Sequence, residues 1–277
     1  MLELADAFKK ITHAKRRHNE LREVFLEWHQ IDGIQLVITR DDTLAKYTWF
    51  IGITKEPAQD LSVLAGEIFS TLRSALDYVT WQIYLAGGGG RDEKRAKGVY
   101  FPIVTDRDKW EKEVKNKVPT AWPEAIALLE SVQPFMQPSK LAQALPALHA
   151  MNNPDKHREL SLVAIGNLTL SAITPDLGDD LGMAILMARP GPVLKLREGE
   201  ILGQVVVNRR SDPPNLEPIP WPPGLHVEQP PVPQYSLAFR DEDGNEVAIT
   251  AIRDLIDHVE SIIDGFGTLP TPRPFLV

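Results

Sequence analysis

Apolar residues recur at helical spacing through most of the first half of the chain. Residues 4–29 and residues 60–86 each place apolar side chains three and four positions apart, a pattern typical of amphipathic helices with one buried face. Four consecutive glycines at positions 87–90 end the second pattern and predict a mobile surface loop. Similar stretches predict further helices at 107–116, 122–132, 141–151 and 252–266.

Runs of β-branched and aromatic residues predict strands elsewhere. Residues 34–39 and 47–53 are separated by a short polar run and predict a β-hairpin. Shorter runs divided by Gly, Pro and Asp predict strands at 160–173, 183–188, 201–208, 234–239 and 246–249. Residues 212–233 hold nine of the 23 prolines and predict an extended surface connection, because proline cannot donate to a strand ladder.

The order of these elements predicts the fold class and the division of the chain. The class is α+β: a helical N-terminal half with a β-hairpin, followed by an antiparallel β-sheet and a C-terminal helix. We expect residues 1–158 to form a mainly helical part that includes the hairpin at 34–53. Residues 159–277 are expected to form a β-rich part with the last helix, and the two parts to share one core.

Composition narrows the environment and the kinds of partner. The 277-residue chain has a net charge of −8, which excludes a broadly basic nucleic-acid surface but leaves room for a local cationic groove. It has no cysteine, which excludes disulfides and thiolate metal sites and is typical of a reducing compartment. No apolar run is long enough to cross a bilayer, and the first residues lack a signal-peptide pattern. The sequence therefore predicts a cytoplasmic protein without a membrane partner.

A dense polar cluster separates the two predicted parts. It combines an acid, two cations, an imidazole and two amides around a proline: Asn152, Asn153, Pro154, Asp155, Lys156, His157 and Arg158. The two cations can bind an anion, and His157 titrates near neutral pH and can act as a general acid or base. The same residues also suit a structural turn, because Asn and Asp side chains cap backbone N–H groups. Both interpretations remain open at this point.

A second group of candidate residues lies on the predicted helix at 60–86. Four of them share one stripe of the helix and a fifth lies beside it: Gly66, Ser70, Arg73, Asp77 and Glu67. Arg73 stands among apolar residues, so we expect its guanidinium to be partly buried and to need a carboxylate, a carbonyl or a ligand anion. An Arg73–Asp77 ion pair at helical spacing is the alternative without a ligand. Gly66 inside a helix suggests that another segment passes close to it.

Common enzyme motifs are absent from the sequence. It has no Walker loop, no dinucleotide-binding fingerprint, no serine nucleophile elbow and no His-Glu-x-x-His. The six histidines outside the polar cluster show no metal-type spacing, and an isolated Asp-x-His pair supplies too few ligands for a stable site. We therefore expect no metal and no cofactor.

Four segments together resemble a widespread family of uncharacterised bacterial and phage-associated proteins. They are residues 61–78, 101–103, 133–135 and 153–158, and the match spans roughly residues 1–170. In that family the helix reads Gly-Asp-x-x-His-Asn-Leu-Arg-Ser-Ala-Leu-Asp-His. This chain keeps Gly66, Leu72, Arg73, Ser74, Ala75, Leu76 and Asp77, and it differs at Glu67, Ser70, Thr71 and Tyr78.

A more distant likeness is to helical proteins of the HEPN type. RNA-cleaving members of that group place an arginine and a histidine near one scissile phosphate, often at a dimer interface. The likeness implies that Arg73 or Arg158 would stabilise phosphate charge and that His157 would move the proton. It also implies RNA as a partner and a homo-oligomer as the assembly.

Three hypotheses for function follow. The first is a binding protein that holds an anionic ligand, a nucleotide or an RNA phosphate, where the Arg73 helix joins the turn at 153–158. Its ligand-binding residues would be Glu67, Asp77, Asn153, Asp155, Lys156 and Arg158. The second is a metal-independent HEPN-like ribonuclease with His157 and Arg73 as catalytic residues. The third is a protein in which the same residues form a structural ion-pair network. The sequence leaves open whether the protein is an enzyme.

Overall fold

The structure is a computed structural model that describes part of the chain. The described residues are 2–30, 34–41, 46–53, 60–91, 94–137, 141–152, 160–167, 181–186, 193–195, 199, 201–209, 234–241, 243–270 and 272. In these ranges no helix is both long and apolar enough to cross a membrane. The proline-rich segment 212–233 lies outside them, so its predicted role as a surface connection stays a prediction.

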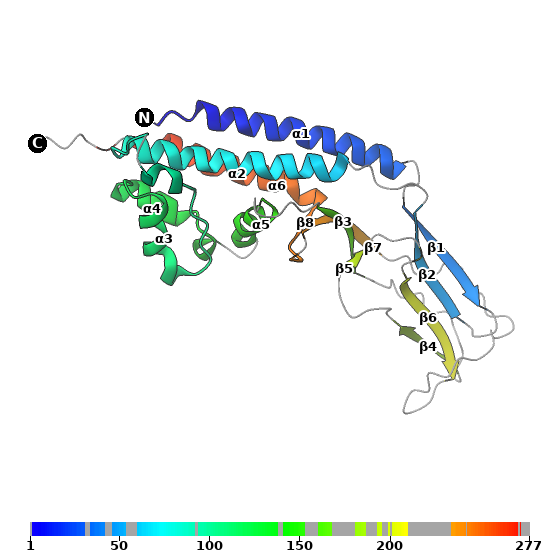
Figure 1. Cartoon of the computed structure of the whole chain (residues 1–277). Coiled ribbons are helices and arrows are strands. Elements are labelled where there is room, and N and C mark those ends of the chain that lie inside the picture. The colour runs from blue at the N-terminus through cyan, green and yellow to red at the C-terminus, as the bar shows by residue number, and fades with distance from the viewer. Residues whose placement is uncertain are drawn as a thin grey trace, which may run out of the picture. The chain divides into compact units, whose positions relative to one another are not determined.

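The elements confirm the predicted α+β class (Figure 1). The α-helices are α1 (Ala5–Gln30), α2 (Asp60–Ala86), α3 (Trp110–Lys117), α4 (Pro123–Ser131), α5 (Ala144–Met151) and α6 (Ile252–Gly267). The strands are β1 (Ile34–Asp41), β2 (Lys46–Ile53), β3 (Ser161–Asn167), β4 (Leu181–Leu186), β5 (Val193–Lys195), β6 (Ile201–Arg209), β7 (Gln234–Arg240) and β8 (Glu246–Ala248). The sequence did not predict β5, whose three residues follow a Gly-Pro pair.

The chain divides into two compact units, and this division differs from the predicted one. Unit 1 comprises Met1–Val24, Gln59–Ser161 and Phe239–Val277, and unit 2 comprises Phe25–Ala58 and Leu162–Ala238. The hairpin belongs to unit 2 because β2 pairs with β6, a strand from much later in the chain. The C-terminal helix belongs to unit 1 because α6 packs against α2 and α5. Contacts between segments so far apart in the chain leave no local pattern in the sequence from which the two units could be predicted.

Unit 2 is built on an antiparallel sheet with the strand order β1-β2-β6-β4. β1 and β2 pair from Ile34 opposite Ile53 to Asp41 opposite Lys46. In the same unit β3 and β5 pair antiparallel, from Val163 opposite Lys195 to Ile165 opposite Val193. The predicted hairpin is therefore the beginning of a larger sheet.

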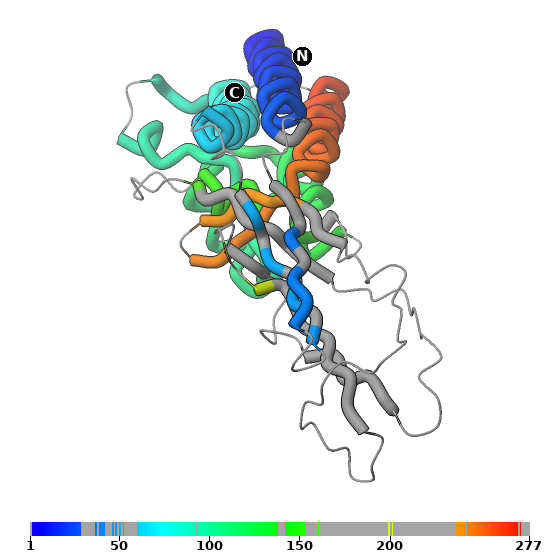
Figure 2. The backbone as a smooth tube through the Cα atoms, turned by 90° about the vertical axis from the view of Figure 1, so that its right-hand side faces the viewer, coloured from blue at the N-terminus to red at the C-terminus, as the bar shows by residue number. Residues whose placement is uncertain are grey.

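In unit 1, α1 and α2 run antiparallel, and polar contacts between them define their register. Tyr78 donates a hydrogen bond from its hydroxyl to Asp6 Oδ2 at 3.0 Å. Arg17 Nε lies 2.7 Å from Glu67 Oε2. Asp6 and Arg17 are eleven residues apart on α1 (17 − 6), and Glu67 and Tyr78 are eleven apart on α2 in the opposite order (78 − 67). The two helices are therefore aligned along their length, as Figures 1 and 2 show.

The apolar faces of α1, α2 and α6 form the core of unit 1. Figure 2 shows these three helices side by side, and Lys15 of α1 pairs with Glu260 of α6 at 2.6 Å. Their fully buried side chains include Ile11, Leu21, Ile68, Phe69, Leu72, Ile83, Ile256, Val259 and Phe266. Each large apolar side chain contributes about 1.5–3 kcal/mol when it is fully buried. This packing holds α2, the helix that carries Arg73, at the centre of the unit.

The glycines that follow α2 form a helix cap, which confirms the prediction that they end the helix. Gly88 has a φ of 93°, in the left-handed region that favours glycine. Its N–H donates to the Leu85 carbonyl at 3.0 Å, and the Gly89 N–H donates to the Tyr84 carbonyl at 2.9 Å. This pair of bonds is a Schellman cap, which satisfies carbonyls that a helix end leaves free.

Gly66 has open space beside it, so the prediction that another segment packs against it is wrong for the described residues. A Cβ added at this position would meet no atom within 4 Å. The residue lies in the interior of α2, where glycine lowers helix stability because it loses more backbone freedom on folding than alanine.

Replacing Gly66 with alanine is therefore expected to stabilise the protein. The gain in the free energy of unfolding should be about 0.5–1 kcal/mol, the difference between glycine and alanine in a helix interior. Urea denaturation followed by circular dichroism measures it. A loss of stability in this variant would show that the space beside Gly66 is occupied.

Candidate functional site

Arg73 and Asp77 together bind the backbone of Phe101. Arg73 Nη2 lies 3.0 Å from Asp77 Oδ1, which confirms the predicted ion pair. The same nitrogen donates to the Phe101 carbonyl oxygen at 2.7 Å, and the Phe101 N–H donates to Asp77 Oδ1 at 2.8 Å. Two side chains of one helix thus satisfy both backbone groups of one residue in another segment. We refer to this arrangement as the Phe101 clasp.

The clasp is more deeply buried at Arg73 than at Asp77. The Arg73 side chain keeps 10% of its surface exposed and the Asp77 side chain 27%. Burial lowers the pKa of the Arg73 guanidinium, and the charge of Asp77 opposes this shift. Burial likewise raises the pKa of the Asp77 carboxyl, against the opposing effects of Arg73 and the Phe101 N–H. Because burial dominates on both sides, the pair gains little by forming, but removing one partner leaves a costly uncompensated charge.

One nitrogen of the Arg73 guanidinium is not used by the clasp. Arg73 Nη1 is buried and has no hydrogen-bond partner among the residues that the structure describes. Buried donors are almost always satisfied, and an unpaired charged donor is especially costly. The missing partner of Nη1 is therefore expected to be a water molecule or an anion.

Three more polar side chains lie within electrostatic range of the clasp. Partial burial of the imidazole ring lowers the pKa of His149, although the residue as a whole stays exposed. The charges of Arg73 and Lys117 lower this pKa further, and Asp77 opposes them. Lys117 also acts to lower the pKa of Asp77, and Tyr100 acts to raise that of Arg73. We refer to Arg73, Asp77, Tyr100, Lys117 and His149 as the Arg73 cluster.

Helices α2, α3 and α5 and the segment before Phe101 supply this cluster. α5 packs against α2 and buries Leu148, while the adjacent His149 stays exposed. Lys117 lies in the last turn of α3, where it pairs with Glu113 at 3.1 Å and keeps 32% of its side chain exposed. Tyr100 is 50% exposed. The cluster thus joins one buried guanidinium to three side chains that solvent and solutes can reach.

The sequence did not identify Tyr100, Lys117 or His149 as site residues. His149 has no metal-type spacing to another histidine, and Lys117 is one of many lysines on predicted helices. The sequence feature that could have pointed to His149 is helix amphipathicity, because His149 directly follows a leucine on the apolar face of a predicted helix. That signal marks an exposed position but cannot reveal that α5 lies against α2.

The other predicted site residues are not placed in the cluster. Glu67 pairs with Arg17 of α1 at 2.7 Å, so a cation of the same unit already engages its carboxylate. Five predicted residues lie outside the described part of the chain: Asn153, Asp155, Lys156, His157 and Arg158. Their predicted roles remain predictions.

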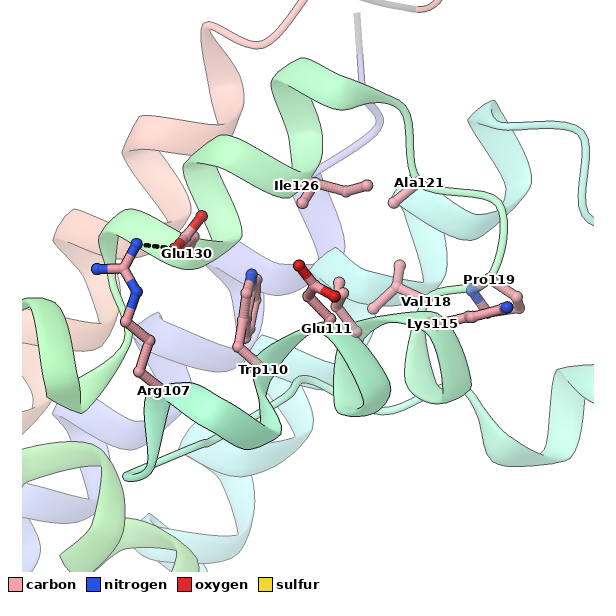
Figure 3. Close-up of a pocket in the computed structure, with 10 residues that line it drawn as sticks. Arg107, Trp110, Glu111, Lys115, Val118, Pro119, Ala121, Ile126 and Glu130 are labelled. Atoms are coloured by element: carbon pink, nitrogen blue, oxygen red, sulfur yellow. Dashed lines mark hydrogen bonds and ion pairs between the residues drawn. The ribbon is translucent and has the colours of Figure 1, made fainter.

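A pocket of about 580 Å³ lies between α3 and α4, and it shares no residue with the cluster (Figure 3). Trp110, Val114 and Ile126 contribute apolar walls. At one end Arg107 Nη2 lies 3.3 Å from Glu130 Oε1. The charged lining residues are two cations and two carboxylates, so their balance gives the pocket no preference for an anion.

The cluster suits the binding of an oxyanion. A guanidinium offers planar paired donors, and an ammonium adds a compact positive charge, the two groups that proteins use most for phosphate. In the part of the chain that the structure describes, no group of three or more His, Asp or Glu is placed to hold a metal ion. The residues of the cluster can donate hydrogen bonds, compensate negative charge and exchange a proton at His149.

Stability is expected to depend on pH through three histidines. Burial is the main cause that lowers the pKa of His18, His149 and His258. Since each folded pKa lies below the unfolded value of about 6.5, their stabilising contribution is complete above that pH and is lost as pH falls through the folded pKa. We expect the urea midpoint to fall between about pH 7.5 and pH 5.5. His258→Gln should make the fall in the urea midpoint smaller. An unchanged dependence of the midpoint on pH would contradict the assignment of this effect to His258.

Comparison with known proteins identifies no relative of this chain. No family model, no curated protein and no solved structure matches it. The function is therefore inferred from the geometry and charge of the site.

Proposed function

We propose that unit 1 binds a phosphate-bearing ligand at the Arg73 cluster. The observation that carries the proposal is Nη1 of Arg73, a buried charged donor that has no hydrogen-bond partner among the described residues. A phosphate oxygen would accept a hydrogen bond from this donor, whereas a neutral apolar ligand would not. Lys117 and His149 add an ammonium and an imidazole within electrostatic range of the same guanidinium.

The acidic groups near the cluster do not prevent anion binding. Asp77 Oδ1 already accepts from both Arg73 and the Phe101 N–H, so the clasp compensates much of its charge. Glu113 pairs with Lys117, but both side chains are about one-third exposed. Such partly exposed pairs contribute only about 0–1 kcal/mol, so a phosphate can replace the carboxylate at little cost.

Isothermal titration of the full chain with 5′-AMP and with ribose 5-phosphate tests the proposal. Both should bind, and Lys117→Gln and His149→Gln should each weaken binding about tenfold, because a hydrogen bond to a charged group contributes about 1.5–3 kcal/mol. Lys115→Gln is the matched control, since it removes a lysine from the same helix but outside the cluster. Equal melting temperatures would show that the variants fold alike.

Two outcomes would overturn the proposal. One is the absence of binding by both compounds at millimolar concentration. The other is binding that neither Lys117→Gln nor His149→Gln weakens, because the ligand would then be bound elsewhere.

A structural role for Arg73 and Asp77 is the second candidate function, and the Phe101 clasp favours it. The two hydrogen bonds to Phe101 join the segment at 99–104 to α2 whether or not a ligand is present. The two roles are compatible, because the clasp uses Nη2 of Arg73 and no described residue is hydrogen-bonded to Nη1. No observation favours the ribonuclease alternative over binding, since His157 lies outside the described residues.

A further inference from the structure

Tyr100 is an aromatic residue of unit 1 whose side chain is not buried in the core. It is 50% exposed, and the other large apolar side chains exposed in the described part of the chain are aliphatic: Leu26, Val63, Met136 and Ile201. Aromatic rings of this size normally bury much of their surface, and an exposed one next to a polar site suits ligand contact.

The backbone that follows Tyr100 is held at two points. On its C-terminal side, the Phe101 peptide is bound by the clasp at 2.7 Å and 2.8 Å, and the Phe101 side chain is fully buried. Three residues later, the Val104 N–H donates to Gln133 Oε1 at 2.9 Å. Gln133 is itself fully buried and donates to the Leu129 carbonyl at 2.9 Å. The segment therefore presents Tyr100 from a backbone that is already ordered, which lowers the entropic cost of binding.

Tyr100 is also close to the charged part of the site. It immediately precedes Phe101, whose carbonyl oxygen accepts from Arg73 Nη2 at 2.7 Å. Consistent with this proximity, Tyr100 acts to raise the pKa of the Arg73 guanidinium. An exposed aromatic ring is thus carried by the residue next to the one whose carbonyl Arg73 binds.

We propose that Tyr100 stacks on the base of a nucleoside phosphate whose phosphate group is bound by Arg73, Lys117 and His149. The ligand class is therefore a nucleotide, either free or as a residue of single-stranded RNA, and not a simple phosphate ester. This inference rests on the proposed function, because it assigns the base to the site that binds the phosphate. Stacking on an aromatic side chain tolerates any base, so the site reads the presence of a base and not its identity.

Comparing 5′-AMP with ribose 5-phosphate isolates the base, because the two compounds carry the same sugar and phosphate. In isothermal titrations of the full chain, AMP should bind at least about fivefold more tightly, the lower end of what a stacked base contributes. Tyr100→Ala should remove this difference, so that the variant binds AMP no more tightly than ribose 5-phosphate, while Tyr100→Phe should keep it. Val63→Ala, which shortens another exposed apolar side chain of unit 1, should have no effect on either compound.

The outcomes separate the stacking inference from the proposed function. If the wild-type chain binds both compounds equally, or if Tyr100→Ala retains the preference for AMP, stacking is overturned and phosphate binding stands. If neither compound binds, the proposed function fails and the inference fails with it. A single-stranded oligoadenylate that binds more tightly than AMP, with the same dependence on Tyr100, would identify RNA as the source of the nucleotide.

Discussion

Replacing Arg73 with alanine is expected to destabilise unit 1 by about 3–5 kcal/mol, the cost of leaving one member of a buried pair uncompensated. The variant loses three contacts at once: the ion pair with Asp77, the hydrogen bond to the Phe101 carbonyl, and the packing of the buried side chain. In this variant the Asp77 carboxylate keeps the hydrogen bond from the Phe101 N–H but loses its cationic partner Arg73. Urea denaturation at pH 7 measures the change.

Arg253 provides a matched control, because it forms an ion pair with Asp257 at the same helical spacing. The Arg253 Nε to Asp257 Oδ2 distance is 2.9 Å, but the two side chains are 48% and 47% exposed. Arg253→Ala should cost no more than about 0.5 kcal/mol, as exposed pairs do. If the Arg73 and Arg253 variants lose similar stability, then burial and the clasp do not determine how much the Arg73–Asp77 pair contributes to the free energy of unfolding.

The double variant Arg73→Met and Asp77→Asn distinguishes the structural role from the binding role. It removes both charges, so it should recover part of the stability that Arg73→Ala loses. It should still fail to bind AMP, because the guanidinium is absent. Recovery of stability together with full AMP binding would exclude Arg73 from the ligand site.

Replacing Gly87 with alanine is expected to destabilise the protein by about 3 kcal/mol, the upper part of the range for overpacking a well-packed site. A Cβ at Gly87 would lie 1.9 Å from the Thr120 carbonyl oxygen and 2.8 Å from its carbon. Backbone atoms cannot rotate away as a flexible side chain can, and Thr120 is also held by the hydrogen bond from its hydroxyl to the Tyr84 carbonyl at 2.7 Å. The end of α2 and the segment before α4 would have to separate.

Gly66→Ala is the control for this variant, since it makes the same substitution inside α2, the helix that Gly87 follows. The two variants should change stability in opposite directions, because one added Cβ meets open space and the other meets backbone. Thermal unfolding of both variants at the same pH measures this contrast. A neutral effect of Gly87→Ala would show that the segment at Thr120 yields easily.

The helices were predictable because their signals are local. α2 was predicted at 60–86 and is observed as Asp60–Ala86, since a long apolar periodicity ends there at a run of glycines. The hairpin was predicted from two β-rich runs and a polar turn, and it is observed as β1 and β2. Its membership of unit 2 was not predictable, because the pairing of β2 with β6 joins segments far apart in the sequence.

The candidate site was predictable only in part. Arg73 among apolar residues, with Asp77 four positions later, was enough to predict a buried guanidinium and its carboxylate partner. The sequence could not identify Phe101 as the backbone that the two side chains bind, nor bring Lys117 and His149 to them. These residues belong to segments that meet only through packing.

By itself the sequence determined what depends on neighbours along the chain: the helical periods, the strand runs, the caps and the helical spacing of Arg73 and Asp77. Such features are set by backbone geometry within one or two turns, so residue type and spacing suffice to predict them. Only the tertiary structure decided which backbone the clasp binds, and that open space lies beside Gly66 but not beside Gly87. It also decided that Tyr100 and His149 lie within electrostatic range of a guanidinium whose Nη1 has no partner in the described part of the chain. Those properties depend on which distant surfaces pack together, because burial and electrostatic range are set by distance in space and not along the chain.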